Sequence, residues 1–130
     1  KQVLEVVASG LHDMKGLYLR ASQSQRDKAM LWMSAFGIEN LAERRFCTLS
    51  GGEQRLVLLT RTLIRQSPLL ILDEPLHGLD MAKKQWVKKV IEHITHNNPV
   101  TLIYVTHYTD EIPASVDHTF TLTKYRSPQQ

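Results

Sequence analysis

The feature that most constrains this chain is a run of four apolar residues, Leu69 to Leu72, that ends in Asp73 and Glu74. Such a run is typical of a buried parallel strand. In open α/β sheets, ligands bind beyond the carboxyl ends of the strands, where these two acids lie. There Asp73 would reach Mg²⁺ through water, because magnesium takes few carboxylates and keeps several waters. Glu74 would polarise an attacking water as a general base. The alternative is a plain acidic turn, which the preceding apolar run and the following Pro75 disfavour.

Residues 68 to 124 alternate between strand and helix patterns. A helix is predicted from about residue 81 to 96, and residues 100 to 106 form the next strand, since they are rich in β-branched and aromatic side chains. A short helix or turn is predicted at 109–116 and an edge strand at 118–124. This order predicts an α/β fold with right-handed crossovers in a mainly parallel sheet. The inner face of the first helix is predicted to carry Trp86, Val87, Val90, Ile91 and Ile94.

Residues 1 to about 66 show a different, helical pattern. Ser24, with Asp27 three residues later, predicts the start of a helix that runs to about Phe36. Gly37 then occupies the usual glycine position after a helix. The change of pattern predicts a boundary between residues 66 and 67.

Residues 49 to 54 read Leu-Ser-Gly-Gly-Glu-Gln. Ser50 and Glu53 form a capping box ahead of a helix predicted from about Glu53 to Gln66. The free amides and dipole of such a helix end attract anions, and Gly51 and Gly52 let a phosphate approach closely. A capped helix without a ligand is the competing interpretation.

His107 directly follows the strand predicted at residues 100–106. A lone histidine there is more often structural than catalytic. This one, however, is predicted at the same sheet edge as Glu74, within reach of a bound phosphate. His93 and His96 are better explained as favourable charges at a helix end than as metal ligands. Cys47 is interpreted as a packing residue rather than an activated thiol.

Composition excludes several classes of protein. The chain of 130 residues is 42% hydrophobic and 22% charged, which is typical of a globular protein with one core. No apolar run approaches the roughly 20 residues of a membrane-spanning helix. The start of the chain does not resemble a signal peptide, and the single cysteine fits a reducing compartment. The net charge of +3 is scattered apart from lysines at 83, 84, 88 and 89, so no nucleic-acid partner is expected.

Together these features resemble the ATP-binding cassette (ABC) ATPase superfamily. Residues 49–54 match its signature motif, 69–74 its Walker B motif, 78–80 its D-loop and His107 its H-loop. The 23 residues from Ser50 to Asp73 and the 33 from Glu74 to His107 are also typical of it. The resemblance implies a P-loop NTPase-like fold, with a helical signature subdomain at 1–66 and the C-terminal part of a RecA-like core at 67–130.

The resemblance further implies ATP hydrolysis with Mg²⁺ between two cassettes that dimerise head to tail. The residues that would bind the partner cassette's nucleotide or couple the two sites are Ser50, Gly51, Gly52, Glu53, Gln54 and Asp80. Those that would serve this cassette's own nucleotide are Asp73 as metal ligand and Glu74 and His107 as catalytic residues.

One motif of the superfamily is missing from these residues. No Gly-x-x-x-x-Gly-Lys-Ser/Thr occurs, so the loop that cradles the phosphates is not in this chain. We therefore expect the C-terminal part of a longer protein that hydrolyses essentially no ATP by itself. We also expect an uncovered apolar sheet edge and face, with marginal stability or self-association.

The sequence Leu76-His77 after Walker B, with residues 6–10 and 12–18, resembles the molybdate-transport-associated, photorepair type of ATP-binding protein. That resemblance implies transport, a second cassette in tandem, a membrane-embedded transport subunit, and a cytoplasmic location at the inner face of the membrane. A soluble cassette protein with a regulatory or DNA-repair role is the alternative. A coiled-coil chromosome ATPase is disfavoured, because Gly10, Gly16 and Gly37 interrupt any heptad pattern. A non-catalytic interaction module is disfavoured as well, because Glu74 and His107 are both present.

Overall fold

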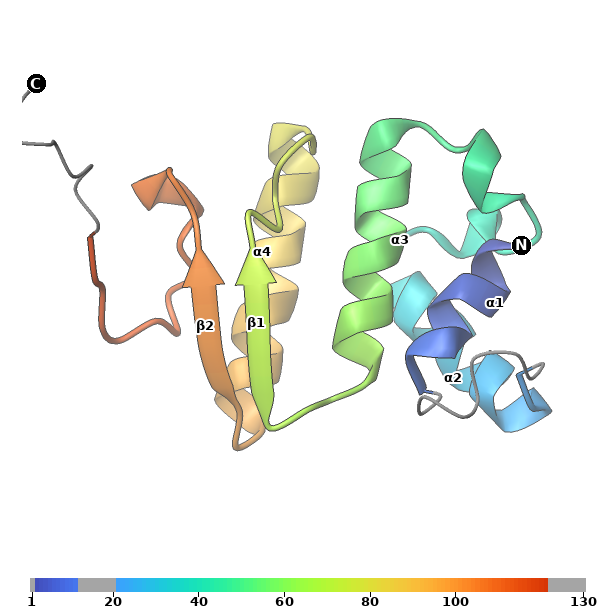
Figure 1. The fold of residues 1–130 in the computed structure, drawn as a ribbon, viewed down its shortest axis with the longest axis horizontal. Helices are drawn as coiled ribbons and strands as arrows, with labels where there is room; N and C mark the ends of the chain where they lie inside the picture. The colour runs from blue at the N-terminus through green and yellow to red at the C-terminus, as the bar shows by residue number, and fades with distance from the viewer. Residues whose placement is uncertain (1, 12–20, 122–130) are drawn as a thin grey trace, which may run out of the picture.

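The computed structural model describes residues 2–11 and 21–121, and within them a group of helices lies beside a small parallel sheet (Figure 1). In chain order the main elements are α1 (Val3–Ala8), α2 (Gln23–Ala35), α3 (Gly51–Ile64), β1 (Leu69–Asp73), α4 (Met81–Asn97) and β2 (Thr101–Val105). Short 3₁₀ helices lie at Ser9–Leu11, Glu39–Leu41, Phe46–Thr48 and Thr109–Glu111. The α/β fold predicted from the sequence is confirmed.

The sheet consists of β1 and β2, which pair in parallel with Leu69 opposite Thr101 and Asp73 opposite Val105. The helix α4 connects them, as the strand–helix–strand pattern predicted. The predicted edge strand is not seen, because residues 118–121 are irregular; its remaining residues lie outside the described part of the chain. Alternating polarity at 118–121 therefore did not indicate a strand, since no neighbouring strand pairs with this segment.

Two residues correct the predicted start of α2. The helix begins after Ser22 rather than Ser24: the Ser22 hydroxyl accepts from the Gln25 amide, and the Gln25 side chain accepts from the Ser22 N–H. The backbone N–H groups of Ser22 and Gln25, which have no partner within the helix, are thereby hydrogen-bonded. Ser24 and Asp27 do not provide such a pair of bonds. The end was predicted correctly, because Gly37 has a φ of 70° and its N–H donates to Ser34 O.

A continuous cluster of buried apolar side chains joins the helical half of the chain to the sheet half. Leu56 and Leu63 of α3 belong to it, together with Val87 and Ile91 of α4. The boundary predicted between residues 66 and 67 falls in the connection from α3 to β1 and stays a prediction. The shared core means that packing in one half supports the other.

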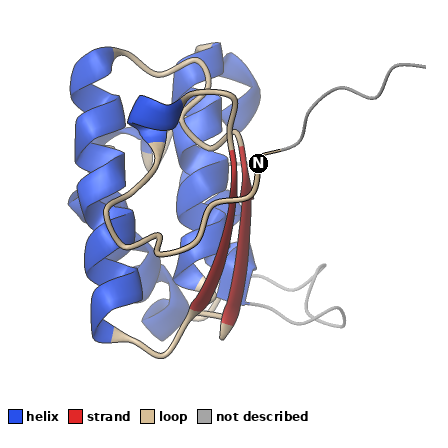
Figure 2. Cartoon of the chain, turned by 90° about the vertical axis from the view of Figure 1, so that its left-hand side faces the viewer, coloured by secondary structure: helices blue, strands red, loops and turns tan. Residues whose placement is uncertain are grey.

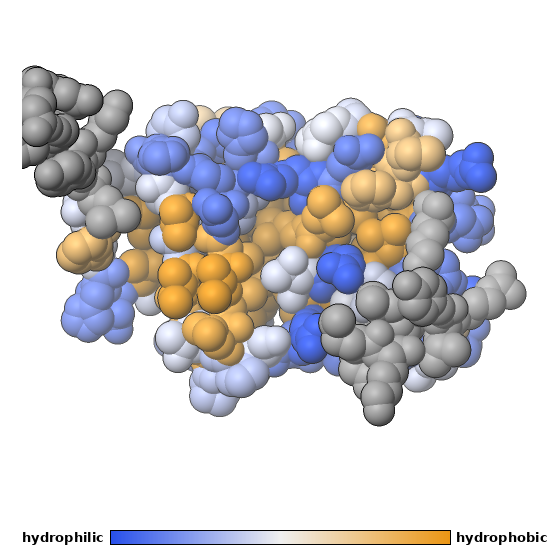
Figure 3. All heavy atoms as spheres, viewed as in Figure 1, coloured by the Kyte–Doolittle hydropathy of each residue, from blue (hydrophilic) through white to orange (hydrophobic). Residues whose placement is uncertain are grey.

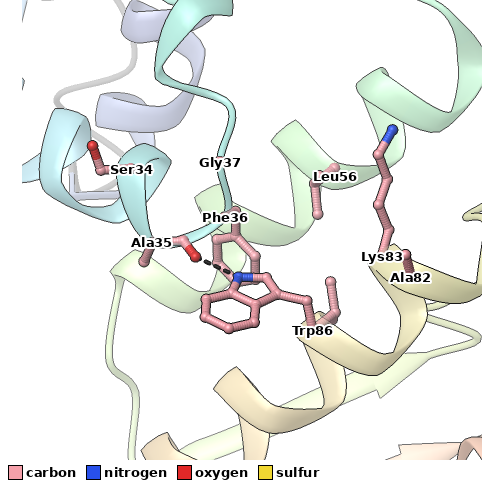
Figure 4. A pocket seen from close by; sticks show the side chains of 9 residues that line it. Ser34, Ala35, Phe36, Gly37, Leu56, Ala82, Lys83 and Trp86 are labelled. Atoms are coloured by element: carbon pink, nitrogen blue, oxygen red, sulfur yellow. Dashed lines mark hydrogen bonds between the residues drawn. The ribbon is translucent and has the colours of Figure 1, made fainter.

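Trp86 was predicted to lie on the buried face of α4, and this was wrong. Half of the side chain is exposed, at 50%. Figure 4 shows the indole reaching from α4 to the end of α2, where its N–H donates to Ala35 O at 2.6 Å. The ring borders a pocket of about 300 Å³ that Phe36 and Leu56 also line, and none of the predicted site residues lines it. The indole is amphipathic, so it can span a partly open seam between two helices.

One face of the sheet is uncovered in the described part of the chain. Viewed edge-on in Figure 2, the strands have helices on one side only. The outward side chains Leu69, Ile71, Ile103 and Val105 are 46–57% exposed, and apolar atoms gather over β1 and β2 in Figure 3. The predicted buried strand β1 is thus buried on one face only, because its alternate residues pack towards α4. The expected exposed apolar face is present.

This face predicts that the 130-residue chain associates with itself in solution. Replacing both Ile71 and Ile103 with lysine should weaken that association more than roughly tenfold, because the change removes two apolar contacts and places like charges side by side. Sedimentation equilibrium measures the effect. Leu31→Lys is the matched control, since Leu31 is 72% exposed on α2, away from the sheet. Equal weakening by the control would contradict the assignment of the face.

Candidate functional site

The predicted site residues gather along one edge of the molecule. In Figure 1, the carboxyl ends of β1 and β2 and the amino-terminal ends of α3 and α4 all point to the same, upper edge. This follows from the parallel pairing, because a crossover helix returns the chain so that both strands end together. None of the helices in the described residues is both long and apolar enough to span a membrane.

Glu74 lies at the centre of this edge. Its N–H donates to Val105 O at 2.8 Å, which continues the sheet pairing one residue beyond β1. Its φ of 48° is in the left-handed region, a conformation that costs a non-glycine residue roughly 1–2 kcal/mol. Surrounding contacts must hold such a residue in place, and strained backbone of this kind is characteristic of functional sites.

His107 lies directly beside Glu74, as the strand order predicted. The His107 N–H donates to Glu74 Oε1 at 3.0 Å, and His107 Nε2 is 3.4 Å from the same oxygen. The carboxylate side chain is 20% exposed, whereas the imidazole is 85% exposed. The pair therefore presents a fixed carboxylate and a freely accessible imidazole to solvent.

The turn at residues 49–54 is held by its own side chains. Ser50 N–H donates to Glu53 Oε1 at 2.9 Å, and Glu53 N–H donates to the Ser50 hydroxyl at 3.2 Å, so the predicted capping box is confirmed. The bond from the Ser50 N–H holds the pKa of Glu53 below its ordinary value. Gln54 Nε2 donates to Phe46 O at 3.1 Å. The helix begins at Gly51, two residues earlier than predicted, because the cap itself lies at Ser50.

Gly52 connects this turn to the loop after β1. A Cβ atom at Gly52 would lie 3.1 Å from Gly78 O, so the absence of a side chain lets the two backbones approach closely. Gly78 itself has a φ of 82°. The start of α3 and the loop between β1 and α4 are therefore in direct contact.

Asp80 caps α4. Its Oδ1 accepts from Lys83 N–H at 2.8 Å, and Lys83 Nζ is 3.9 Å from Oδ2. A helix-capping role alone explains this geometry. The next residue, Lys84, pairs with the buried Glu111 at 2.6 Å, and this hydrogen bond raises the pKa of Lys84. The predicted coupling role of Asp80 therefore stays a prediction.

Asp73 is exposed at the last position of β1. In the described part of the chain, no three histidine, cysteine or acidic side chains lie together as a metal site. One exposed carboxylate nevertheless suits Mg²⁺, because this ion takes few protein carboxylates and keeps several waters. Asp73 therefore fits a magnesium ion whose other ligands are waters and a bound nucleotide.

Sequence reasoning missed Arg55. Its Nη2 donates to Glu74 O at 2.5 Å, so it links α3 to the loop after β1. Its place on the second turn of α3 was evident from the sequence, but the direction of its side chain was not. Cys47 is exposed, so its interpretation as a packing residue was wrong. His93 contacts the Asn97 side chain, and the interpretation of His93 and His96 as helix-end charges stays a prediction.

The sequence profile of the ABC transporter family matches residues 1–77 of this chain. The chain belongs to the ABC transporter family.

Several curated ABC proteins are similar to this chain. ModF, an ABC transporter ATP-binding protein of Escherichia coli, is 35% identical over 117 residues, which are 89% of this chain and 24% of ModF. The ATP-binding protein YlmA of Bacillus subtilis is 38% identical over 83% of this chain and 41% of its own length. The molybdenum import ATP-binding protein ModC of Brucella abortus is 40% identical over 65% of this chain and 24% of its own length. The chain thus spans less than half of each relative.

Solved ABC structures share the fold. A dimeric bacterial ABC transporter cassette superimposes with a TM-score of 0.74 at 24% identity, covering 85% of this chain and 48% of the cassette. An ABC transporter in an inward-facing conformation gives a TM-score of 0.68 at 25% identity, covering 85% of this chain and 44% of that one. The ABC fold expected from the motifs is confirmed.

Proposed function

We propose that this chain is the signature- and Walker B-bearing part of an ABC cassette that binds and hydrolyses ATP to drive transport. Residues 1–66 form the helical signature subdomain, and 67–130 form part of the ATPase core. The observation that carries the proposal is the Glu74 carboxylate. It is fixed by the His107 N–H at the edge where the start of α3 meets the loop after β1.

Glu74 acts as the general base that orients the attacking water. Its carboxylate is partly exposed and bound through Oε1 to the His107 N–H, so its position is set before a water arrives. The His107 imidazole, largely exposed, contacts the γ-phosphate. In phosphoryl transfer most of the catalysis is positioning and charge stabilisation, and this arrangement supplies positioning.

The turn at 49–54 binds the nucleotide of a second cassette. Ser50, Gly51 and Gly52 contact its γ-phosphate through hydroxyl and amide groups at the start of α3. Glu53 and Gln54 bind Ser50 and Phe46 instead, so they shape the turn. Asp80, which caps α4 next to Gly78, couples the two sites across the cassette dimer.

Asp73 would hold Mg²⁺ through water, and the ion would neutralise charge on the phosphate oxygens of the nucleotide. The protein's contribution is to place one carboxylate at the end of β1, next to the residue that orients the water.

The partners are a second cassette and a membrane-embedded transport subunit, and the protein works at the cytoplasmic face of the membrane. The dimeric cassette among the similar structures supports the first. The molybdenum import protein ModC among the relatives supports the second, and it supports molybdate as the cargo.

The proposal predicts ATP turnover by the full-length protein and essentially none by the 130-residue chain alone. The chain lacks the phosphate-cradling loop, so it cannot hold the nucleotide that Glu74 serves. Steady-state phosphate release from both proteins, with molybdate uptake by cells that express the full-length protein, tests this. Turnover by the isolated chain, or an inactive full-length protein, would overturn the proposal.

A further inference from the structure

Arg55 joins the helix that begins at the 49–54 turn to the residue after β1. It lies on the second turn of α3, and its Nη2 is 2.5 Å from Glu74 O. The side chain is partly buried, and its Nε has no hydrogen-bond partner among the described residues. The guanidinium is therefore directed at a single acceptor, the backbone of Glu74.

Four hydrogen bonds hold Glu74. Its N–H is bound to Val105 O at the end of β2, and its carboxylate to the His107 N–H just after that strand. Its carbonyl accepts from the His77 N–H within the same loop at 3.2 Å. The Arg55 guanidinium binds its carbonyl from α3. The φ of 48° needs such contacts, because an unrestrained glutamate avoids this conformation. Arg55 is the one contact of these four that comes from the helical half of the chain.

We propose that Arg55 is a positioning residue for Glu74 and that it ties the placement of this carboxylate to the position of α3. The proposal rests on the proposed function, in which Glu74 is the general base. A charged donor on a partly buried carbonyl makes a stronger bond than a neutral donor does. The close contact between Gly52 and Gly78 holds the same helix to the same loop. A shift of α3 therefore moves Glu74.

This coupling has a consequence for the reaction. The 49–54 turn lies at the start of the helix that carries Arg55. A nucleotide that binds this turn and shifts α3 therefore changes the position of Glu74 in the same chain. Arg55 does not touch the reacting atoms, and its loss should slow turnover without weakening nucleotide binding. Lysine retains the charge but lacks the planar fork of donors, so it should replace arginine only in part.

The test compares Arg55→Gln and Arg55→Lys in the full-length protein by steady-state ATP hydrolysis. We expect Arg55→Gln to lower kcat roughly 10–100-fold, since a small displacement of a catalytic group has effects of this size. KM for ATP should change less than about threefold, and Arg55→Lys should recover part of the rate. Arg61→Gln is the matched control, because Arg61 lies on the same helix but binds Ser9 instead.

A second readout does not depend on turnover. The His107 N–H is bound to the Glu74 carboxylate, so hydrogen exchange at this amide should be faster in Arg55→Gln and unchanged in Arg61→Gln. If the unaltered protein hydrolyses no ATP, the proposed function fails, and the exchange rate alone decides whether Arg55 positions Glu74.

Three outcomes would overturn the proposal: an unchanged kcat in Arg55→Gln, an equal loss in Arg61→Gln, or unchanged exchange at His107. If Arg55→Gln does not fold, as judged by circular dichroism, Arg55→Lys decides. A lysine variant with wild-type kcat and wild-type exchange at His107 would then also count against the proposal.

Discussion

Glu74→Gln in the full-length protein is expected to lower the rate of ATP hydrolysis by about 10²–10⁴-fold, the usual contribution of a general base. The amide retains an oxygen that can accept from the His107 N–H, as Glu74 Oε1 does at 3.0 Å. The geometry should therefore persist while the ability to take a proton is lost. Steady-state phosphate release measures the rate, and equilibrium binding of ATP should be unchanged.

Glu92→Gln is the matched control for this experiment. Glu92 also accepts a backbone N–H, that of Ala114 at 2.8 Å, but it lies on α4 outside the predicted site. The control should hydrolyse ATP at the wild-type rate. A Glu74→Gln protein as fast as the unaltered one would mean that this cassette is a regulatory or degenerate site, and that the motifs describe ancestry rather than catalysis.

Leu63→Ala is expected to lower the free energy of unfolding of the chain by about 2–5 kcal/mol, the range for truncating a buried leucine. Leu63 is 2% exposed. It borders a hollow with Leu70 of β1 and Ile94 of α4, so it packs between the helical half and the sheet half. Losing it should weaken both halves together. Urea denaturation followed by circular dichroism measures the change.

Leu58→Ala is the control on the same helix, because Leu58 is 44% exposed. Its replacement should cost about 1 kcal/mol at most, since little additional apolar surface is lost from the core. Equal effects of the two substitutions would show that α3 does not pack through the face that carries Leu63. Both leucine variants should also be measured in a chain that carries lysine at positions 71 and 103, so that self-association does not affect the unfolding curves.

Short-range patterns were sufficient to predict most of the second half of the chain. The apolar run before Asp73 and the β-branched segment before His107 each became a strand, and both strands end at the same edge. The proximity of Glu74 and His107, separated by 33 residues, followed from this, because parallel strands joined by a helix end together. Ser50 and Glu53 formed the predicted capping box because both partners lie within one turn.

Other features were predicted wrongly from the sequence. Ser24 was predicted to cap α2, whereas Ser22 and Gln25 form the capping box, a pattern that the sequence also contains. Trp86 has the spacing of a core residue, yet it reaches across to Ala35. Helical spacing indicates which face a residue occupies, but it does not show how far the neighbouring helix lies from it.

The sequence by itself determined the family, the order of helices and strands, and the edge at which the acids and His107 meet. These depend on local propensity, on motif spacing and on the rule that parallel strands end together. Only the tertiary structure decided that Arg55 binds the backbone of Glu74, that Gly52 touches Gly78, and that Leu69 and Ile71 are the residues of β1 on the uncovered face. These features depend on segments that are distant in the chain. Where a side chain points between two packed elements depends on how those elements are placed relative to each other, which local sequence patterns do not specify.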